Sequence, residues 1–200
     1  MVKHNKNSNN KIICIGTSTG GPRALQEILS KMPKEINAPI VIVQHMPQGF
    51  TKSLANRLNS ICAIHVKEAE HGEILKCGTA YIAQGGKHFV VQSDRTNNLI
   101  AHLTETEPVS GHRPSVNVLF ESLSTIQNYD KIAVILTGMG ADGSAGLIKL
   151  KEKSDRCIAI AESEETCIVF GMPKAAIATN LVDIVCRLDE IPKMIKKFMN

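Results

Sequence analysis

The first apolar run of the chain reads IICIGTSTGGP over residues 12–22 and passes directly into a pattern with helical spacing. The residues from Ile12 to Ile15 are apolar and mostly β-branched, as is typical of a short buried strand. Beyond Pro22, a favourable first residue for a helix, apolar residues return at helical spacing: Leu25, Ile28, Leu29 and Met32. This stretch therefore predicts a strand, a sharp glycine turn and a helix.

Ser18 lies at the centre of that turn, where Gly16 to Gly20 match the pattern G-x-S-x-G. A strand before the pattern and a helix after it are the context in which it forms a nucleophile elbow. The competing interpretation is a glycine loop that binds phosphate at a helix N-terminus. The stretch contains neither G-x-G-x-x-G nor G-x-x-x-x-G-K, so it favours a nucleophile and leaves the phosphate site open.

Similar units follow along the chain. Apolar runs that read as buried strands recur at residues 38–43, 131–136, 157–161 and 181–186, each followed by an amphipathic helical pattern. Near-continuous apolar strands alternating with helices are typical of a parallel sheet that is covered on both faces. We therefore predict a doubly wound α/β fold, with a mainly parallel sheet and helices on both faces.

Two segments depart from this alternation. Shorter apolar runs at 80–83 and 89–91 flank a Gly-Gly pair, which predicts an antiparallel hairpin excursion around residues 79–92. Residues 1–11 form a polar tail rich in Asn and Lys, and we predict that it is disordered. The remaining residues, 12–200, are long enough to form one domain with a sizeable core.

Composition excludes several classes of protein. No stretch approaches the roughly 20 apolar residues of a membrane span, and the N-terminal segment is too polar for a signal peptide, so we expect a cytoplasmic protein without membrane insertion. The net charge of +4, with no Trp and two Tyr, argues against nucleic acid as a partner. The histidines and cysteines lack metal-ligand spacing, so we predict no metal and no cofactor.

Three reactive side chains follow predicted strand ends, where ligands bind in such sheets: Ser18, His45 and Asp142. A serine hydroxyl needs a base to become a nucleophile, and histidine is the usual base near neutral pH. A carboxylate then holds the imidazole in the correct tautomer. We predict that these residues form a catalytic triad, with the backbone N–H groups of Thr19 and Met139 binding the oxyanion.

Five motifs, in order along the chain, resemble one known family: GTSTGGP (16–22), QHMP (44–47), GHRPS (111–115), TGMGADG (137–143) and GMPKAA (171–176). Together they resemble the catalytic domain of CheB, the chemotaxis protein-glutamate methylesterases. The resemblance implies hydrolysis of glutamate γ-methyl esters on methyl-accepting chemotaxis receptors, with release of methanol, and deamidation of receptor glutamines as a second activity. It assigns Ser18 as nucleophile, His45 as base and Asp142 as the orienting acid, in agreement with the interpretation from the residues.

The chain departs from the family pattern at Thr17, Gln84 and Asn117, where Ala, Pro and Asp are usual. None of these changes removes a catalytic group, so they bear on receptor recognition more than on chemistry. Arg113 is predicted to bind the acidic receptor, because a guanidinium pairs well with carboxylates, and its alternative role is a structural ion pair.

The family's usual form carries an amino-terminal receiver domain that covers the active site. This chain is expected to have an open site, with a separate receiver protein as a candidate partner in trans. Two other functions stay open on the sequence. One is a phosphate-ligand binding domain that uses Ser18 and the loop at 138–143, and the other is a non-catalytic signalling module that binds receptors.

Overall fold

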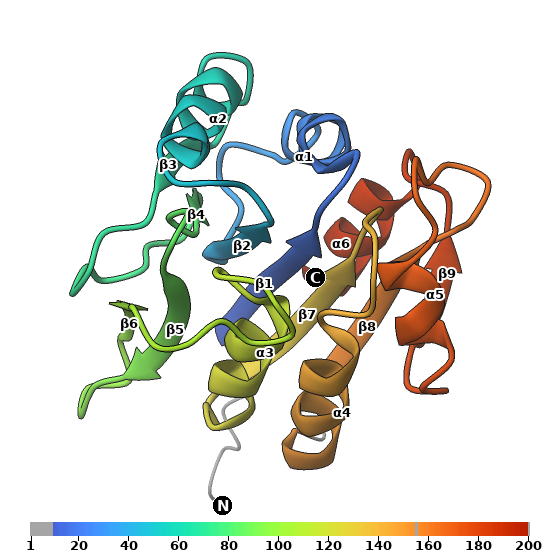
Figure 1. Ribbon diagram of the computed structural model, residues 1–200. Helices are drawn as coiled ribbons and strands as arrows, with labels where there is room; N and C mark the ends of the chain where they lie inside the picture. The colour runs from blue at the N-terminus through green and yellow to red at the C-terminus, as the bar shows by residue number, and fades with distance from the viewer. Residues whose placement is uncertain (1–9, 155, 200) are drawn as a thin grey trace, which may run out of the picture.

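The computed structural model describes residues 10–154 and 156–199 (Figure 1). The elements run in the order β1 (Asn10–Thr17), α1 (Gly21–Leu29), β2 (Ile40–Gln44), α2 (Phe50–Asn59), β3 (His65–Glu68), β4 (Thr79–Ile82), β5 (His88–Ser93), β6 (Leu99–Thr104), α3 (Val116–Ser124), β7 (Tyr129–Ile135), α4 (Ser144–Lys153), β8 (Cys157–Glu162), α5 (Met172–Ile177), β9 (Ile184–Cys186) and α6 (Ile191–Met199). Among these helices none is long and apolar enough to cross a membrane.

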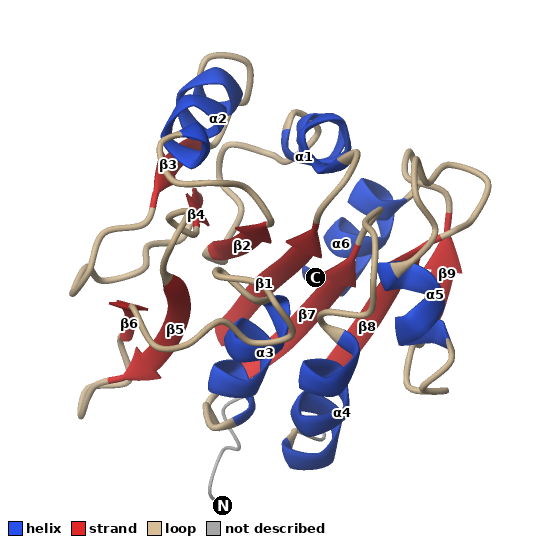
Figure 2. Ribbon diagram, viewed as in Figure 1, coloured by secondary structure: helices blue, strands red, loops and turns tan. Residues whose placement is uncertain are grey.

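Seven strands form one parallel sheet in the order β3-β4-β2-β1-β7-β8-β9. Successive side chains of a strand point to opposite faces. In β1, Ile12 and Cys14 therefore join the core formed with α3, α4 and α5, while Ile13 and Ile15 join the core formed with α1, α2 and α6. Figure 2 shows α3 and α4 in front of the sheet. The predicted doubly wound α/β fold is confirmed.

The central strand β1 is also where the chain changes direction across the sheet. Its neighbours are β2 on one side and β7 on the other, and both pairings are parallel. At the carboxyl ends of β1 and β7, the loops that follow these two strands therefore lead away from each other. Such a switch point is where ligands bind in open α/β sheets.

The antiparallel pair lies further along the chain than predicted. Thr79–Ile82 is β4, a strand of the parallel sheet between β2 and β3, whereas the antiparallel partners are β5 and β6. All four residues of β4 are buried, as expected for an interior strand, while β6 alternates between buried and partly exposed residues. The apolar runs alone could not show which neighbour each strand pairs with.

The boundary of the polar tail also changes. Asn10 and Lys11 belong to β1, where they pair with Tyr129 and Asp130 of β7. Backbone hydrogen bonds extend a strand without regard to side-chain polarity, so the polar side chains of Asn10 and Lys11 do not indicate where β1 begins. Residues 1–9, the rest of the predicted tail, lie outside the described residues.

Candidate active site

The glycine turn after β1 places Ser18 at the carboxyl edge of the sheet. Its backbone N–H donates to the Thr137 carbonyl at 3.0 Å, and the Gly21 N–H donates to the Ser18 carbonyl at 2.9 Å. A Cβ at Gly21 would lie 1.9 Å from Gln44 Oε1, and Gly20 has a φ of 87°, so larger side chains would disrupt this turn. Ser18 as a whole residue is only partly buried at this edge.

His45 follows β2, the strand next to β1. The pairing of the two strands continues past their ends, because the His45 N–H donates to the Thr17 carbonyl at 3.0 Å. The buried Gln44 side chain also joins the two segments, since its Nε2 donates to the carbonyls of Ser18 at 2.9 Å and His45 at 3.0 Å. The predicted nucleophile and the predicted base are therefore held side by side at the strand ends.

Asp142, in the loop after β7, is bound directly to His45. The distance from His45 Nε2 to Asp142 Oδ2 is 2.7 Å, and the Asp142 side chain is fully buried. The carboxylate also accepts hydrogen bonds from Ser115 Oγ at 2.7 Å and from the N–H groups of Val116 at 2.6 Å and Asn117 at 3.0 Å. These two N–H groups belong to the first turn of α3, a favourable place for a negative charge.

These contacts decide the ionisation of Asp142. Burial raises the pKa of its carboxyl, but the hydrogen bonds from His45, Asn117, Ser115 and Val116 together outweigh burial and hold the pKa below its usual value. Asp142 is therefore an anion at neutral pH. An anion beside Nε2 favours the tautomer that carries its proton on that nitrogen.

The other ring nitrogen of His45 is consequently the one that can accept a proton. His45 Nδ1 is buried and has no hydrogen-bond partner among the described residues. In the familiar serine protease triad the carboxylate binds Nδ1 of the histidine, whereas here the carboxylate of Asp142 binds Nε2. Within the described structure no hydrogen bond joins the Ser18 hydroxyl to His45. Of the three predicted triad residues, His45 and Asp142 are therefore in direct contact, and Ser18 lies at the end of the neighbouring strand.

The predicted oxyanion donors lie on the two loops that meet at Ser18. A Cβ at Gly138 would lie 2.8 Å from Ser18 Cβ, so the loop after β7 packs directly against the serine. Among the hydrogen bonds of the described residues, the N–H groups of Thr19 and Met139 have no acceptor. Both residues are exposed, Met139 to 72%. These donors are thus available to a ligand at the same edge.

The side chain of Asn117 has a structural role that the sequence did not reveal. Its side-chain Oδ1 accepts from the N–H groups of Gly143 at 2.9 Å and Gly146 at 2.7 Å, in the loop and first turn after Asp142. The side chain therefore fastens the Asp142 loop to α3. The sequence marked Asn117 only as a departure from the family pattern, because the acid loop that it fastens is distant along the chain.

We expect Asn117→Ala to destabilise the protein and to reduce activity together. The change leaves two buried N–H groups without acceptors, at a cost of about 1–3 kcal/mol each. Thermal unfolding and ester hydrolysis, measured on the same samples, would show both effects. Asn117→Asp keeps the acceptor oxygen and should lose less of either. An alanine variant as stable as the parent protein would contradict this role.

Arg113 is bound to its own loop. Its Nη1 donates to the carbonyls of Glu105 and Thr106, both at 3.0 Å, and the residue lines a cavity of about 260 Å³ together with His45 and His112. These contacts are with backbone, so they match neither a substrate carboxylate nor the structural ion pair considered from the sequence. A role for Arg113 in substrate binding stays a prediction.

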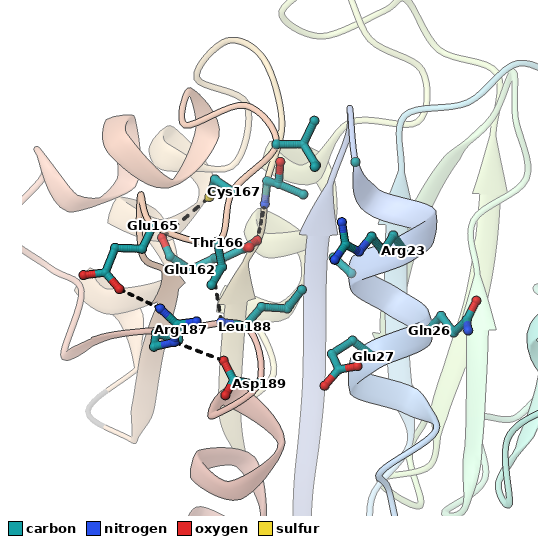
Figure 3. Close-up of a pocket in the computed structure, with 14 residues that line it drawn as sticks. Arg23, Gln26, Glu27, Glu162, Glu165, Thr166, Cys167, Arg187, Leu188 and Asp189 are labelled. Atoms are coloured by element: carbon teal, nitrogen blue, oxygen red, sulfur yellow. Dashed lines mark hydrogen bonds and ion pairs between the residues drawn. The ribbon is translucent and has the colours of Figure 1, made fainter.

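A larger cavity, of about 640 Å³, lies on the other side of the elbow. Figure 3 shows Arg23 and Glu27 of α1 along one wall and Arg187 and Asp189 on the opposite wall. Arg187 is held there by Glu165 at 2.8 Å and by Asp189 at 3.3 Å. This cavity provides space beside the strand ends, but three of its charged groups, Arg187, Glu165 and Asp189, are engaged with one another.

Metal binding has no candidate in the described part of the chain, where no group of three or more His, Cys, Asp or Glu residues could hold an ion.

Comparisons with known proteins identify the family of this chain. The family model of the CheB methylesterases matches residues 13–195. A protein from Oceanobacillus iheyensis named protein-glutamate methylesterase/protein-glutamine glutaminase is 58% identical over 196 residues, which are 98% of this chain and 55% of that protein. A Bacillus subtilis protein of the same name is 48% identical over 191 residues, or 96% of this chain and 53% of the relative.

A solved structure gives the same result. The catalytic domain of the Thermotoga maritima CheB methylesterase superposes with a TM-score of 0.90 at 43% identity, covering 94% of this chain and 98% of that one. The chain spans about half the length of the curated relatives it matches. The resemblance seen in the sequence is thus confirmed, and the chain belongs to the CheB methylesterase family.

Proposed function

We propose that this chain is a serine hydrolase that removes methyl groups from glutamate γ-methyl esters of methyl-accepting chemotaxis receptors and releases methanol. The observation that carries the proposal is the buried hydrogen bond between His45 and Asp142 at the strand edge that also presents Ser18. The relatives' name includes protein-glutamine glutaminase, and we extend the proposal to deamidation at the same site. We expect the reaction to take place in the cytoplasm, as the sequence predicts.

The proposed reaction begins with His45 Nδ1 taking the proton of Ser18 as its oxygen attacks the ester carbonyl. Asp142 stabilises the imidazolium that forms, and the N–H groups of Thr19 and Met139 stabilise the negative oxygen. The imidazolium then protonates the departing methoxide, which leaves as methanol. Water, activated by His45, hydrolyses the acyl-serine and restores Ser18 with a free glutamate.

The phosphate-binding alternative receives less support from the contacts at the helix ends. The N–H groups of Gly143 and Gly146, where an anion would bind at the start of α4, are occupied by Asn117 Oδ1. At the start of α1 the Gly21 N–H is taken by the Ser18 carbonyl. A non-catalytic receptor-binding module would not need the buried hydrogen bond between His45 and Asp142.

A fluorophosphonate probe, which reacts with activated serines, tests the proposal. We expect it to label Ser18 in the parent chain and to leave His45→Ala unlabelled, because the alanine variant lacks the base. His65→Ala, which removes an exposed histidine of β3, is the matched control and should label normally. Equal labelling of the His45 and His65 variants, or hydrolysis of methylated receptor without labelling at Ser18, would refute the assignment.

A receiver protein in trans remains a predicted partner of this site. The methanol-release rate, measured with and without such a protein and a small phosphodonor, tests it. A change only when both are present would support the partnership.

A further inference from the structure

A second histidine lies directly on the predicted base. The imidazole rings of His45 and His112 are stacked, with their centroids 3.8 Å apart and their planes 10° from parallel. His45 comes from the end of β2 and His112 from the segment before α3, so the contact joins residues that are distant in sequence. It covers one face of the ring whose Nδ1 would accept the serine proton.

A tight turn holds His112 in this position. The backbone N–H groups of Val109 and His112 each donate to the other residue's carbonyl, at 3.1 and 3.0 Å. Between them Ser110 and Gly111 have φ angles of 53° and 78°, and two such residues in succession are characteristic of a type I′ turn. Within the described chain neither ring nitrogen of His112 has a hydrogen-bond partner, so the ring is placed by the turn and by its contact with His45.

The surroundings of His112 oppose a positive charge on it. Burial lowers the pKa of its imidazole, the charge of a protonated His45 lowers it further, and Asp142 acts in the opposite direction. The adjacent Arg113 turns Nη1 toward the carbonyls of Glu105 and Thr106. Two cations at the stacking distance would repel each other strongly, because the site is partly shielded from water.

We propose that His112 is a positioning residue for the base. Its uncharged ring supports His45, so that His45 alone carries a positive charge when the pair takes up an additional proton. The inference rests on the proposed role of His45 as base. When Ser18 gives up its proton, positive charge develops on His45. A neutral His112 holds the His45 ring in place and keeps water away from it without opposing the positive charge on His45. A cation at the position of His112 would oppose that charge.

The pH dependence of kcat for receptor methyl-ester hydrolysis tests this inference. His112→Phe retains an aromatic ring without charge and should lower kcat by about threefold at most, whereas His112→Arg should lower it by something on the order of 100-fold. In His112→Arg the acid limb of the profile should also move to lower pH, because the added positive charge opposes protonation of the neighbouring base. His65→Arg adds the same charge at an exposed site of β3 and should change neither quantity. A folded His112→Arg protein with the parent kcat and pH profile would overturn the proposal, as would equal losses in His112→Phe and His112→Arg.

A titration that needs no activity separates this inference from the proposed function. NMR spectra of the imidazoles should show that His45→Phe, which keeps a stacked ring but removes the charge, raises the pKa of His112 toward the ordinary value of about 6.5. Ser18→Ala should leave that pKa unchanged. If the titrations follow this pattern but no ester is hydrolysed, the proposed function alone fails. If the parent protein hydrolyses the ester but the pKa of His112 is the same in His45→Phe as in the parent, the positioning role alone fails.

Discussion

Replacement of Ser18 by alanine is expected to abolish methyl-ester hydrolysis and to leave the fold intact. The loss should be at least about 10⁴-fold, because removal of the nucleophile of a triad leaves only the catalysis provided by binding and by the oxyanion donors. The fold should survive because the hydroxyl has no partner among the described contacts and the turn is held through the Ser18 backbone N–H and carbonyl. Methanol release and thermal unfolding are the two measurements.

Ser163 provides a matched control for this experiment. It follows β8 as Ser18 follows β1, and its hydroxyl likewise has no hydrogen-bond partner in the described residues. Ser163→Ala should therefore retain the parent rate, because none of the histidines among the described residues lies in the loop that follows β8. Continued turnover by a natively folded Ser18→Ala protein would require another nucleophile.

Asp142→Asn is expected to lower both activity and stability. In a serine protease the same exchange lowers kcat about 10⁴-fold, because the amide favours the wrong imidazole tautomer, and we expect a loss of at least a hundredfold here. Stability should fall by about 1–3 kcal/mol, since the carboxylate accepts four hydrogen bonds and an NH₂ group would face some of those donors. The kcat of the folded fraction and the free energy of unfolding, measured together, separate the two effects.

The pH dependence of stability provides a second measurement on the same variant. The pKa of Asp142 is lowered in the folded state, so its contribution to stability is present above the ordinary carboxyl pKa and is lost as the pH falls through the folded value. Asp142→Asn lacks this contribution, and its disadvantage should therefore shrink in acid.

Asp183→Asn is the control for this pair of measurements. Asp183 Oδ2 binds Lys151 and the Ala159 N–H, away from the triad, so this change should cost stability with little effect on kcat. A tenfold or smaller loss of kcat in Asp142→Asn would mean that another carboxylate orients His45.

The elbow could be predicted from the sequence because its causes are local. The apolar run of β1, the glycines at 16, 20 and 21, and the helical spacing of α1 all lie within one short segment. A glycine requirement and a hydrophobic period act over a few residues, so both are visible in the linear chain. Alternating strands and helices likewise implied that Ser18, His45 and Asp142 would follow strands ending at the same edge.

The tertiary structure alone decided how these residues meet. Asp142 binds Nε2 of His45 because the first turn of α3 and Ser115 fix the orientation of the carboxylate, and those groups come from a segment distant in the chain. The stacking of His112 has the same origin, because the turn before α3 meets His45, which follows β2 in a distant part of the chain. Strand pairing is also a long-range choice, and so β4 entered the parallel sheet although its apolar run fitted a hairpin equally well. Contacts between distant segments depend on how whole layers pack, and a local pattern of residue types contains no record of that packing.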